Sequence, residues 1–103
     1  MYAVMGTWKV PGSREEMIDG LESSVIPFIK TLPGFLSASF SYDEERGTNH
    51  SLLMFSNRES AQRFVDVSYE QRREVQQEAG VERMGEFVVV DVLKMVEAAG
   101  APA

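Results

Sequence analysis

The chain has 103 residues, of which 44% are hydrophobic, and its sixteen acidic and ten basic residues give a formal net charge of −6. This length and composition are typical of one globular domain with a thin core, and they argue against intrinsic disorder. The negative charge argues against nucleic acid and anionic membranes as partners, and the absence of cysteine excludes disulfides and thiolate metal sites.

The N-terminal residues have neither a basic segment nor a long apolar run. A secretory signal needs both features, and a membrane span needs about 20 apolar residues. We therefore expect a protein without a membrane segment, located in the cytoplasm.

Residues 2–10 are rich in β-forming side chains and stop at a Pro-Gly pair, so they predict a strand. Ser13 and Glu16 then have the spacing of a capping box, which predicts the start of a helix. Pro27 interrupts this helix, because its ring removes an amide donor and crowds a carbonyl, so we expect a kink or break at residues 25–26. The apolar stripe of the helix recurs at spacings of three and four residues: Met17, Ile18, Leu21, Val25, Phe28, Ile29 and Leu32.

Two antiparallel strands are predicted next, over residues 35–42 and 49–55. The polar residues 43–48 between them are typical of a hairpin connection, in which Gly47 can adopt a positive φ. Regular alternation places Leu36, Ala38, Phe40 and Tyr42 on an apolar face of the first of these strands, and Phe35, Ser37, Ser39 and Ser41 on the opposite face.

A second helix and a last strand complete the pattern. Ser56 and Glu59 form a second capping box, and the helix that it starts is expected to continue through a Glu/Gln/Arg-rich segment and to stop at Gly80. Residues 86–95 contain a β-branched run that predicts the last strand, and residues 96–103 form a small-residue tail.

This order predicts a single α+β domain over residues 1–95, with the ferredoxin-like arrangement β-α-β-β-α-β. Both helices then lie on one face of a four-stranded antiparallel sheet, and both faces of the sheet carry apolar side chains. Because a monomer would leave one apolar face in water, we predict a homodimer that forms through the sheet face.

The chain resembles the dimeric α+β barrel proteins, and among them the antibiotic biosynthesis monooxygenase family and its haem-degrading relatives. The resemblance covers nearly the whole chain and depends on residues 8–12 (WKVPG), 32–36 (LPGFL) and 53–61 (LMFSNRESA), followed by Phe64. It implies the oxygenation of an aromatic or polyketide-like molecule without a metal or a flavin, so no cofactor is expected. These motifs lie at the ends of secondary-structure elements and indicate the fold more than the activity.

His50 is the only histidine, which excludes a two-histidine metal site, and no metal site is predicted. It is a candidate for proton transfer, although a structural or surface position is the favoured interpretation. The neighbouring Asn49 is a candidate for orienting His50 or a bound carbonyl, with a turn position favoured instead. As catalytic candidates we take His50, Trp8 and Asn57, and as substrate-binding candidates Tyr42, Tyr69 and Arg63.

Two other functions fit the sequence. The first is a non-catalytic dimeric binding or accessory protein, whose interior is filled by methionine and phenylalanine side chains. The second is haem binding or degradation, with His50 as the proximal ligand. A pocket lined by polar groups from several strands would favour the oxygenase, and an interior filled by apolar side chains would favour the binding protein.

Overall fold

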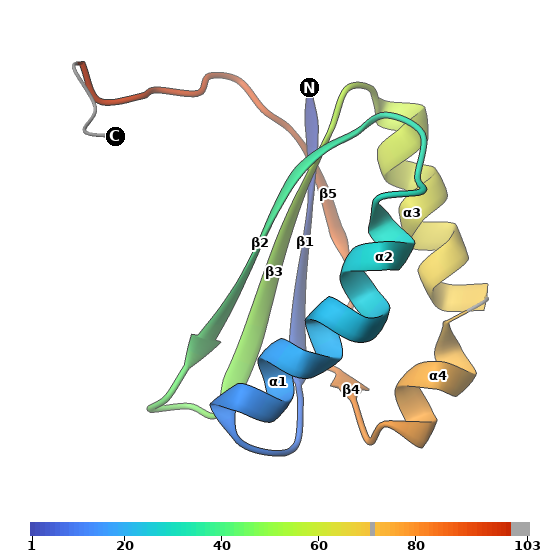
Figure 1. Ribbon diagram of the computed structural model, residues 1–103. Helices are drawn as coiled ribbons and strands as arrows, with labels where there is room; N and C mark the ends of the chain where they lie inside the picture. The colour runs from blue at the N-terminus through green and yellow to red at the C-terminus, as the bar shows by residue number, and fades with distance from the viewer. Residues whose placement is uncertain (71, 100–103) are drawn as a thin grey trace.

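The computed structural model describes residues 1–70 and 72–99 and shows one antiparallel sheet with helices on one of its faces (Figure 1). The strands are β1 (Tyr2–Lys9), β2 (Phe35–Asp43), β3 (Thr48–Phe55), β4 (Glu82–Arg83) and β5 (Val88–Asp91). The helices are α1 (Arg14–Gly20), the π-helix η1 (Leu21–Val25), α2 (Ile26–Ile29), α3 (Arg58–Glu70) and α4 (Arg73–Glu78). The predicted α+β class and order of elements are confirmed.

The edge of the sheet beside β1 is formed by two short strands in place of one. The strand order is β2-β3-β1, and β4 and β5 pair with opposite ends of β1, through Trp8 with Arg83 and Tyr2 with Asp91. The predicted strand over residues 86–95 is therefore wrong in its bounds. Pairing ends where β1 begins, because the N–H of Val92 already bonds to the carbonyl of the first residue.

The core lies between the sheet and the helices. Its centre is formed by Val4, Leu53 and Phe55, which are at most 1% exposed, together with Phe64 and Val65 from α3. These side chains come from the two central strands and from the apolar stripe of α3, as expected of a sheet covered on one face by helices.

A bulge in β2 corrects the predicted alternation of this strand. Phe35 pairs with Phe55 and Ser37 with Met54, so one residue of β2, Leu36, has no counterpart in β3. Phe35 thereby packs against the core, and Leu36 is 51% exposed. Ala38 and Phe40 pack against the core as predicted.

The first helical segment contains a π-turn at the position where Pro27 predicts a break. The capping box is confirmed, since the Ser13 hydroxyl accepts from the Glu16 N–H and the Glu16 carboxylate accepts from the Ser13 N–H. The N–H of Ile26 then bonds to the carbonyl of Leu21, five residues back. In a regular α-helix, the ring of Pro27 would crowd the carbonyl one turn back. The wider turn just before Pro27 relieves this clash.

The second helical segment is divided into α3 and α4, which corrects the prediction of one helix. Its N-cap is Asn57, whose Oδ1 accepts the Ser60 N–H at 2.8 Å, so the capping box predicted on Ser56 is wrong by one residue. Gly80 has a φ of +72° and ends α4, as predicted, and Gly47 in the hairpin has a φ of +65°.

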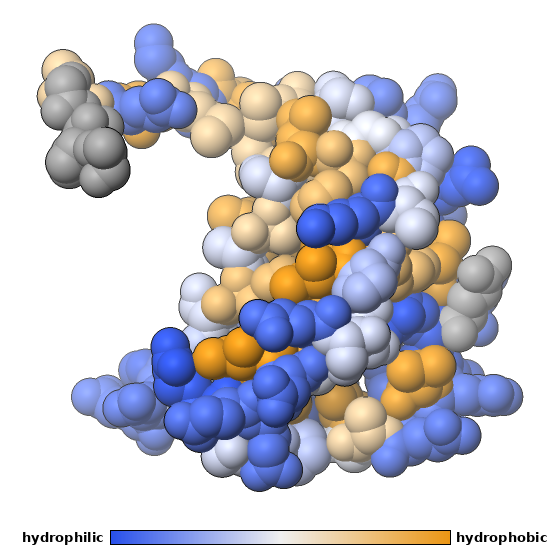
Figure 2. All heavy atoms as spheres, viewed as in Figure 1, coloured by the Kyte–Doolittle hydropathy of each residue, from blue (hydrophilic) through white to orange (hydrophobic). Residues whose placement is uncertain are grey.

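The face of the sheet away from the helices has exposed apolar side chains and is covered by no helix of the described residues, and we call it the open face. It carries Met5, Leu52 and Val88, which are 39–49% exposed, and the C-terminal residues lead away from it with Leu93 92% exposed. Figure 2 shows the hollow between this C-terminal segment and the body of the molecule. A groove of about 380 Å³ lies there, lined by Ala3, Ser37, Ala38, Ser39, Leu52, Met54, Val92 and Met95.

Within the described residues, no helix is long and apolar enough to cross a membrane.

Candidate functional site

Four aromatic rings meet at one end of the sheet, on the side of the helices. Phe87 is at their centre, with its ring centroid 5.4 Å from Trp8, 5.6 Å from Phe64 and 5.4 Å from Tyr69, each in an edge-to-face arrangement. We call these four residues the Phe87 cluster. Edge-to-face contacts bring the positive edge of one ring against the negative face of another, which fixes the orientation of the rings.

Gly6 on β1 makes room for this cluster. A Cβ atom at this position would lie 2.9 Å from the Phe87 ring and 3.1 Å from the Ser51 hydroxyl. The Ser51 hydroxyl in turn accepts a hydrogen bond of 3.2 Å from Nε1 of Trp8. The strand that supplies Trp8 therefore also supplies the space in which Phe87 packs.

Arg83 covers the outer side of the cluster. Its guanidinium lies 4.0 Å from the centroid of Tyr69 and 5.7 Å from that of Phe87, within the range of cation–π attraction. Pairing of β4 with β1 brings Arg83 opposite Trp8, and its Nε donates to the Gly85 carbonyl at 2.9 Å. The positive charge is thus held in a fixed position over the tyrosine ring.

The Tyr69 hydroxyl has both a donor and an acceptor role. It donates to the Glu86 carboxylate at 2.5 Å and accepts from the Phe87 N–H at 3.2 Å. A bond this short between a phenol and a carboxylate is typical of a charge-assisted hydrogen bond. The arrangement connects a partly buried phenol to an exposed carboxylate, which is a path along which a proton can move.

A cleft of about 520 Å³ opens beside Tyr69, between α3, α4 and β4. It is lined by Ser68, Tyr69, Arg73, Gln76, Gln77, Val81, Glu82 and Arg83. Arg46 and Asp43 form the single ion pair among residues 1–70 and 72–99, so the two arginines of the cleft have no carboxylate partner there. Arg73 and Arg83 outnumber the single carboxylate of the lining, Glu82, so the cleft has a local excess of positive charge in a protein of net charge −6.

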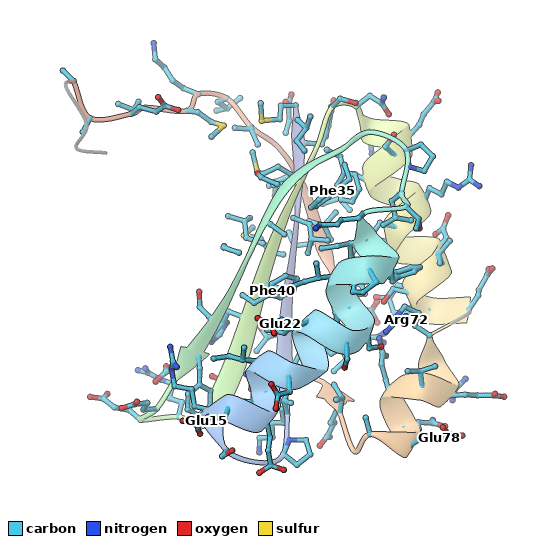
Figure 3. The ribbon with its side chains drawn as sticks, viewed as in Figure 1. Glu15, Glu22, Phe35, Phe40, Arg72 and Glu78 are labelled. Carbon is cyan, nitrogen blue, oxygen red and sulfur yellow. The ribbon has the colours of Figure 1, made fainter. Side chains whose placement is uncertain are left out.

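Arg72 connects the two helical segments next to this cleft (Figure 3). Its Nη2 donates to the Ser24 hydroxyl at 2.8 Å, and its guanidinium lies 4.5 Å from the centroid of the Phe28 ring. Burial lowers the pKa of Arg72 from its ordinary value, but an arginine remains charged at neutral pH. Arg72 therefore attaches the π-turn of the first segment to the start of α4.

Neither a protein-family model nor a curated protein matches this chain. Several chains among the solved structures do match it, including the following two. One is a protein of Deinococcus radiodurans provisionally named an antibiotic biosynthesis monooxygenase, with 13% identity and a TM-score of 0.70 over 97% of this chain and 100% of that one. The other is a monooxygenase from the gene ActVA-Orf6 of Streptomyces coelicolor in complex with nanaomycin D, with 17% identity and a TM-score of 0.67 over 95% of this chain and 92% of that one. This chain has the fold of these monooxygenases.

Within this fold, two of the residues selected from the sequence meet in one place. Trp8 and Tyr69 are both in the Phe87 cluster. Tyr42 is 43% exposed on the edge strand β2, and Arg63 is exposed on α3. Asn57 caps α3, and its Nδ2 donates to the Ser56 hydroxyl.

His50 lies on the open face, on the other side of the sheet from the Phe87 cluster. Its Nε2 is 3.0 Å from the Thr48 hydroxyl and its Nδ1 is 3.4 Å from the Thr7 hydroxyl. Both ring nitrogens therefore face threonine hydroxyl groups of the sheet. Among the residues that the structure describes, no group of three His, Cys, Asp or Glu side chains is placed to hold a metal ion.

The sequence did not indicate Arg83, Glu86 or Phe87 as site residues. Arg83 belongs to a strand of two residues, which is too short to produce a pattern of alternation. Phe87 appeared to belong to a continuous last strand, and its contact with Trp8 joins residues that are distant in sequence. The aromatic content of the segment was the one available signal.

Proposed function

We propose that this protein binds a planar aromatic molecule with an acidic proton in the cleft beside Tyr69, and oxygenates it with O₂, as in the antibiotic biosynthesis monooxygenase family. The observation that carries this proposal is the arrangement of Tyr69 between the cation of Arg83 and the carboxylate of Glu86. An aromatic wall, a cation and a proton acceptor are the groups that such a substrate needs when it becomes an anion. The shared fold with a monooxygenase crystallised with nanaomycin D supports a ligand of this shape.

The proposed reaction balances without a further reductant. An activated CH₂ group loses a proton, and the resulting anion gives its electrons to O₂, so that R₂CH₂ and O₂ yield R₂C=O and H₂O. Tyr69 passes the proton to Glu86, while Arg73 and Arg83 stabilise the anion. The substrate supplies the electrons in this scheme, in keeping with the resemblance, which implies neither metal nor flavin.

Oxygen uptake with 1,8-dihydroxyanthrone as the substrate tests the proposal. We expect the protein to increase the rate of uptake above that in buffer, and Arg83→Gln to lower the increase at least about 10-fold, because it removes the charge that stabilises the anion. Tyr69→Phe should lower it by a similar factor. The matched control is Arg58→Gln, which removes an exposed arginine at the start of α3. An unchanged rate with the parent protein would contradict the proposal.

A non-catalytic binding protein is the second candidate, and the filled interior favours it. Val4, Leu53 and Phe55 occupy the centre between the sheet and the helices, with 0–1% of their surface exposed. In this case, 1,8-dihydroxyanthrone would quench the fluorescence of Trp8, the only tryptophan, without any oxygen uptake.

We further propose that two copies of the chain associate through their open faces. The accessible surface of 7220 Å² exceeds the value of about 5,800 Å² that is typical of a monomer of this mass. The radius of gyration, 14.3 Å, likewise exceeds the typical value of about 13 Å. A standard interface buries roughly 800 Å² of each partner, so a dimer would remove more than half of this excess of about 1,400 Å².

A further inference from the structure

Asn49 has a buried oxygen atom that no group of the described residues satisfies. Its Oδ1 is buried and accepts no hydrogen bond from residues 1–70 or 72–99. Its Nδ2 donates to the Sδ of Met17 at 3.4 Å, and a thioether is a weak acceptor. Most buried side-chain oxygens have a donor, because an unpaired one has lost its bonds to water without replacement. Asn49 also lies within β3, which corrects the turn position expected from the sequence.

The position of Asn49 connects it to the Phe87 cluster. Asn49 pairs with Trp8 on β1 and Tyr42 on β2, and Trp8 pairs with Arg83 on β4. Paired residues of an antiparallel sheet share a face, so these four side chains form one row across the sheet on the side of the helices. Adjacent strands are about 4.8 Å apart, and Asn49 and Arg83 are therefore about 10 Å apart across the sheet, with Trp8 between them.

The cover over Asn49 is easily displaced. Met17, which contacts the Asn49 amide, belongs to α1, a helix of seven residues with no buried side chain. Movement of α1 would expose little apolar surface, so it costs less than the opening of a packed helix. The unbranched Met17 side chain also has several rotamers of similar energy and can move without the helix.

We propose that Asn49 is a ligand-positioning residue, whose Oδ1 accepts a hydrogen bond from a hydroxyl group of an aromatic ligand once Met17 moves aside. The proposal depends on the proposed function only in that the ligand is aromatic and reaches Arg83, and it adds that the ligand lies against Trp8. The anionic end of the ligand then lies at Arg83, and the end with the hydroxyl donor lies at Asn49. A neutral phenol bound at Asn49 is fixed in orientation, because only one of its edges can donate.

The test compares two probes that differ in this donor, 1-naphthol and 1-methoxynaphthalene, by quenching of Trp8 fluorescence under nitrogen. In the parent protein 1-naphthol should bind more tightly. Asn49→Leu should weaken the binding of 1-naphthol about fivefold to tenfold and change that of the methyl ether less than about twofold, the difference expected for one hydrogen bond. Asn49→Ala serves as a second variant if the leucine prevents folding.

The matched control is Gln62→Leu, which removes an exposed amide from α3 and should leave both dissociation constants unchanged. Equal weakening of both probes by Asn49→Leu would show a structural role and overturn the proposal. Unchanged binding of 1-naphthol, or no binding of either probe to the parent protein, would overturn it as well. The binding measurement needs no oxygen. It can therefore support or overturn the role of Asn49 even if the protein turns out not to be an oxygenase.

Discussion

Gly34, between α2 and β2, is held in a conformation that only glycine adopts without strain. Its φ is +74°, and its carbonyl accepts the Ser56 N–H at 2.8 Å. An added Cβ would lie 2.8 Å from the Cβ of Ser60 and 2.9 Å from the Ser56 hydroxyl. The close approach of the loop to the start of α3 therefore depends on the missing side chain.

We predict that Gly34→Ala lowers the free energy of unfolding by about 3 kcal/mol, since it combines the left-handed backbone penalty with overpacking. Gly47→Ala, at a φ of +65° with no atom within 4 Å, should cost about 1 kcal/mol. Gly20→Ala, at a helical φ of −63° and in open space, should stabilise by about 0.5–1 kcal/mol. Urea unfolding of the three variants measures these changes in the free energy of unfolding. Equal changes for Gly34→Ala and Gly47→Ala would contradict the packing argument.

At this scale, residue type alone selects candidates, and the sequence does not show which of them meet. Trp8 was a candidate as a large amphipathic side chain and Tyr69 as a substrate-binding one, and both lie in the Phe87 cluster. The sequence could not indicate that Arg83 stacks on Tyr69, because surface arginines are common and only the fold brings these two together. The unpaired state of the Asn49 oxygen is likewise a property of the packing around it.

The hairpin between β2 and β3 is stabilised by one carboxylate. Asp43 Oδ1 accepts the N–H groups of Glu45 and Arg46, and Oδ2 accepts Nη1 of Arg46 at 2.9 Å. The bond from the Arg46 side chain is the main cause that holds the pKa of Asp43 below its ordinary value of 3.8. Because the folded-state pKa is depressed, the stabilisation is complete above pH 3.8 and is lost as the pH falls through the folded-state pKa.

We predict that Arg46→Gln raises the pKa of Asp43, since the side-chain bond and the charge are both lost while the backbone bonds remain. The carboxyl carbon shift of Asp43, followed by NMR from about pH 6 to about pH 2, measures this change. Arg58→Gln should leave the titration of Asp43 as it is. An unaltered pKa in Arg46→Gln would show that the backbone bonds alone account for the shift.

Elements with strong local signals were predicted well, and irregular ones were not. The capping box at Ser13 and the irregularity before Pro27, which is a π-turn within a continuous helical run, depend on contacts within one or two turns, which a sequence contains in full. The bulge at Leu36 and the division of the last strand depend on which residue of a distant strand lies opposite. Alternation in a single strand carries no information on that register.

The open face and the C-terminal segment expose large apolar side chains to water in a single chain. We predict that the protein sediments in micromolar solution at twice the 11.5 kDa of one chain. Leu52→Glu, which places a charge in the centre of the open face, should shift it to one chain, because a buried unpaired charge opposes association. Val75→Glu is the matched control, since Val75 is 44% exposed on α4 and Leu52 is 39% exposed. A parent protein that sediments at 11.5 kDa would contradict the prediction.

The central place of β1 in the sheet has a consequence for synthesis on the ribosome. All three strands that pair with β1 come later in the chain, since β3 begins at Thr48, β4 begins at Glu82 and β5 ends at Asp91, the residue that pairs with Tyr2. β1, the first of the described strands, therefore waits for its last partner until β5 has been translated. Such long-range pairing slows folding and leaves an apolar strand exposed in the nascent chain. We conclude that the sheet closes only after translation of β5, and that one edge of β1 stays without this partner until then.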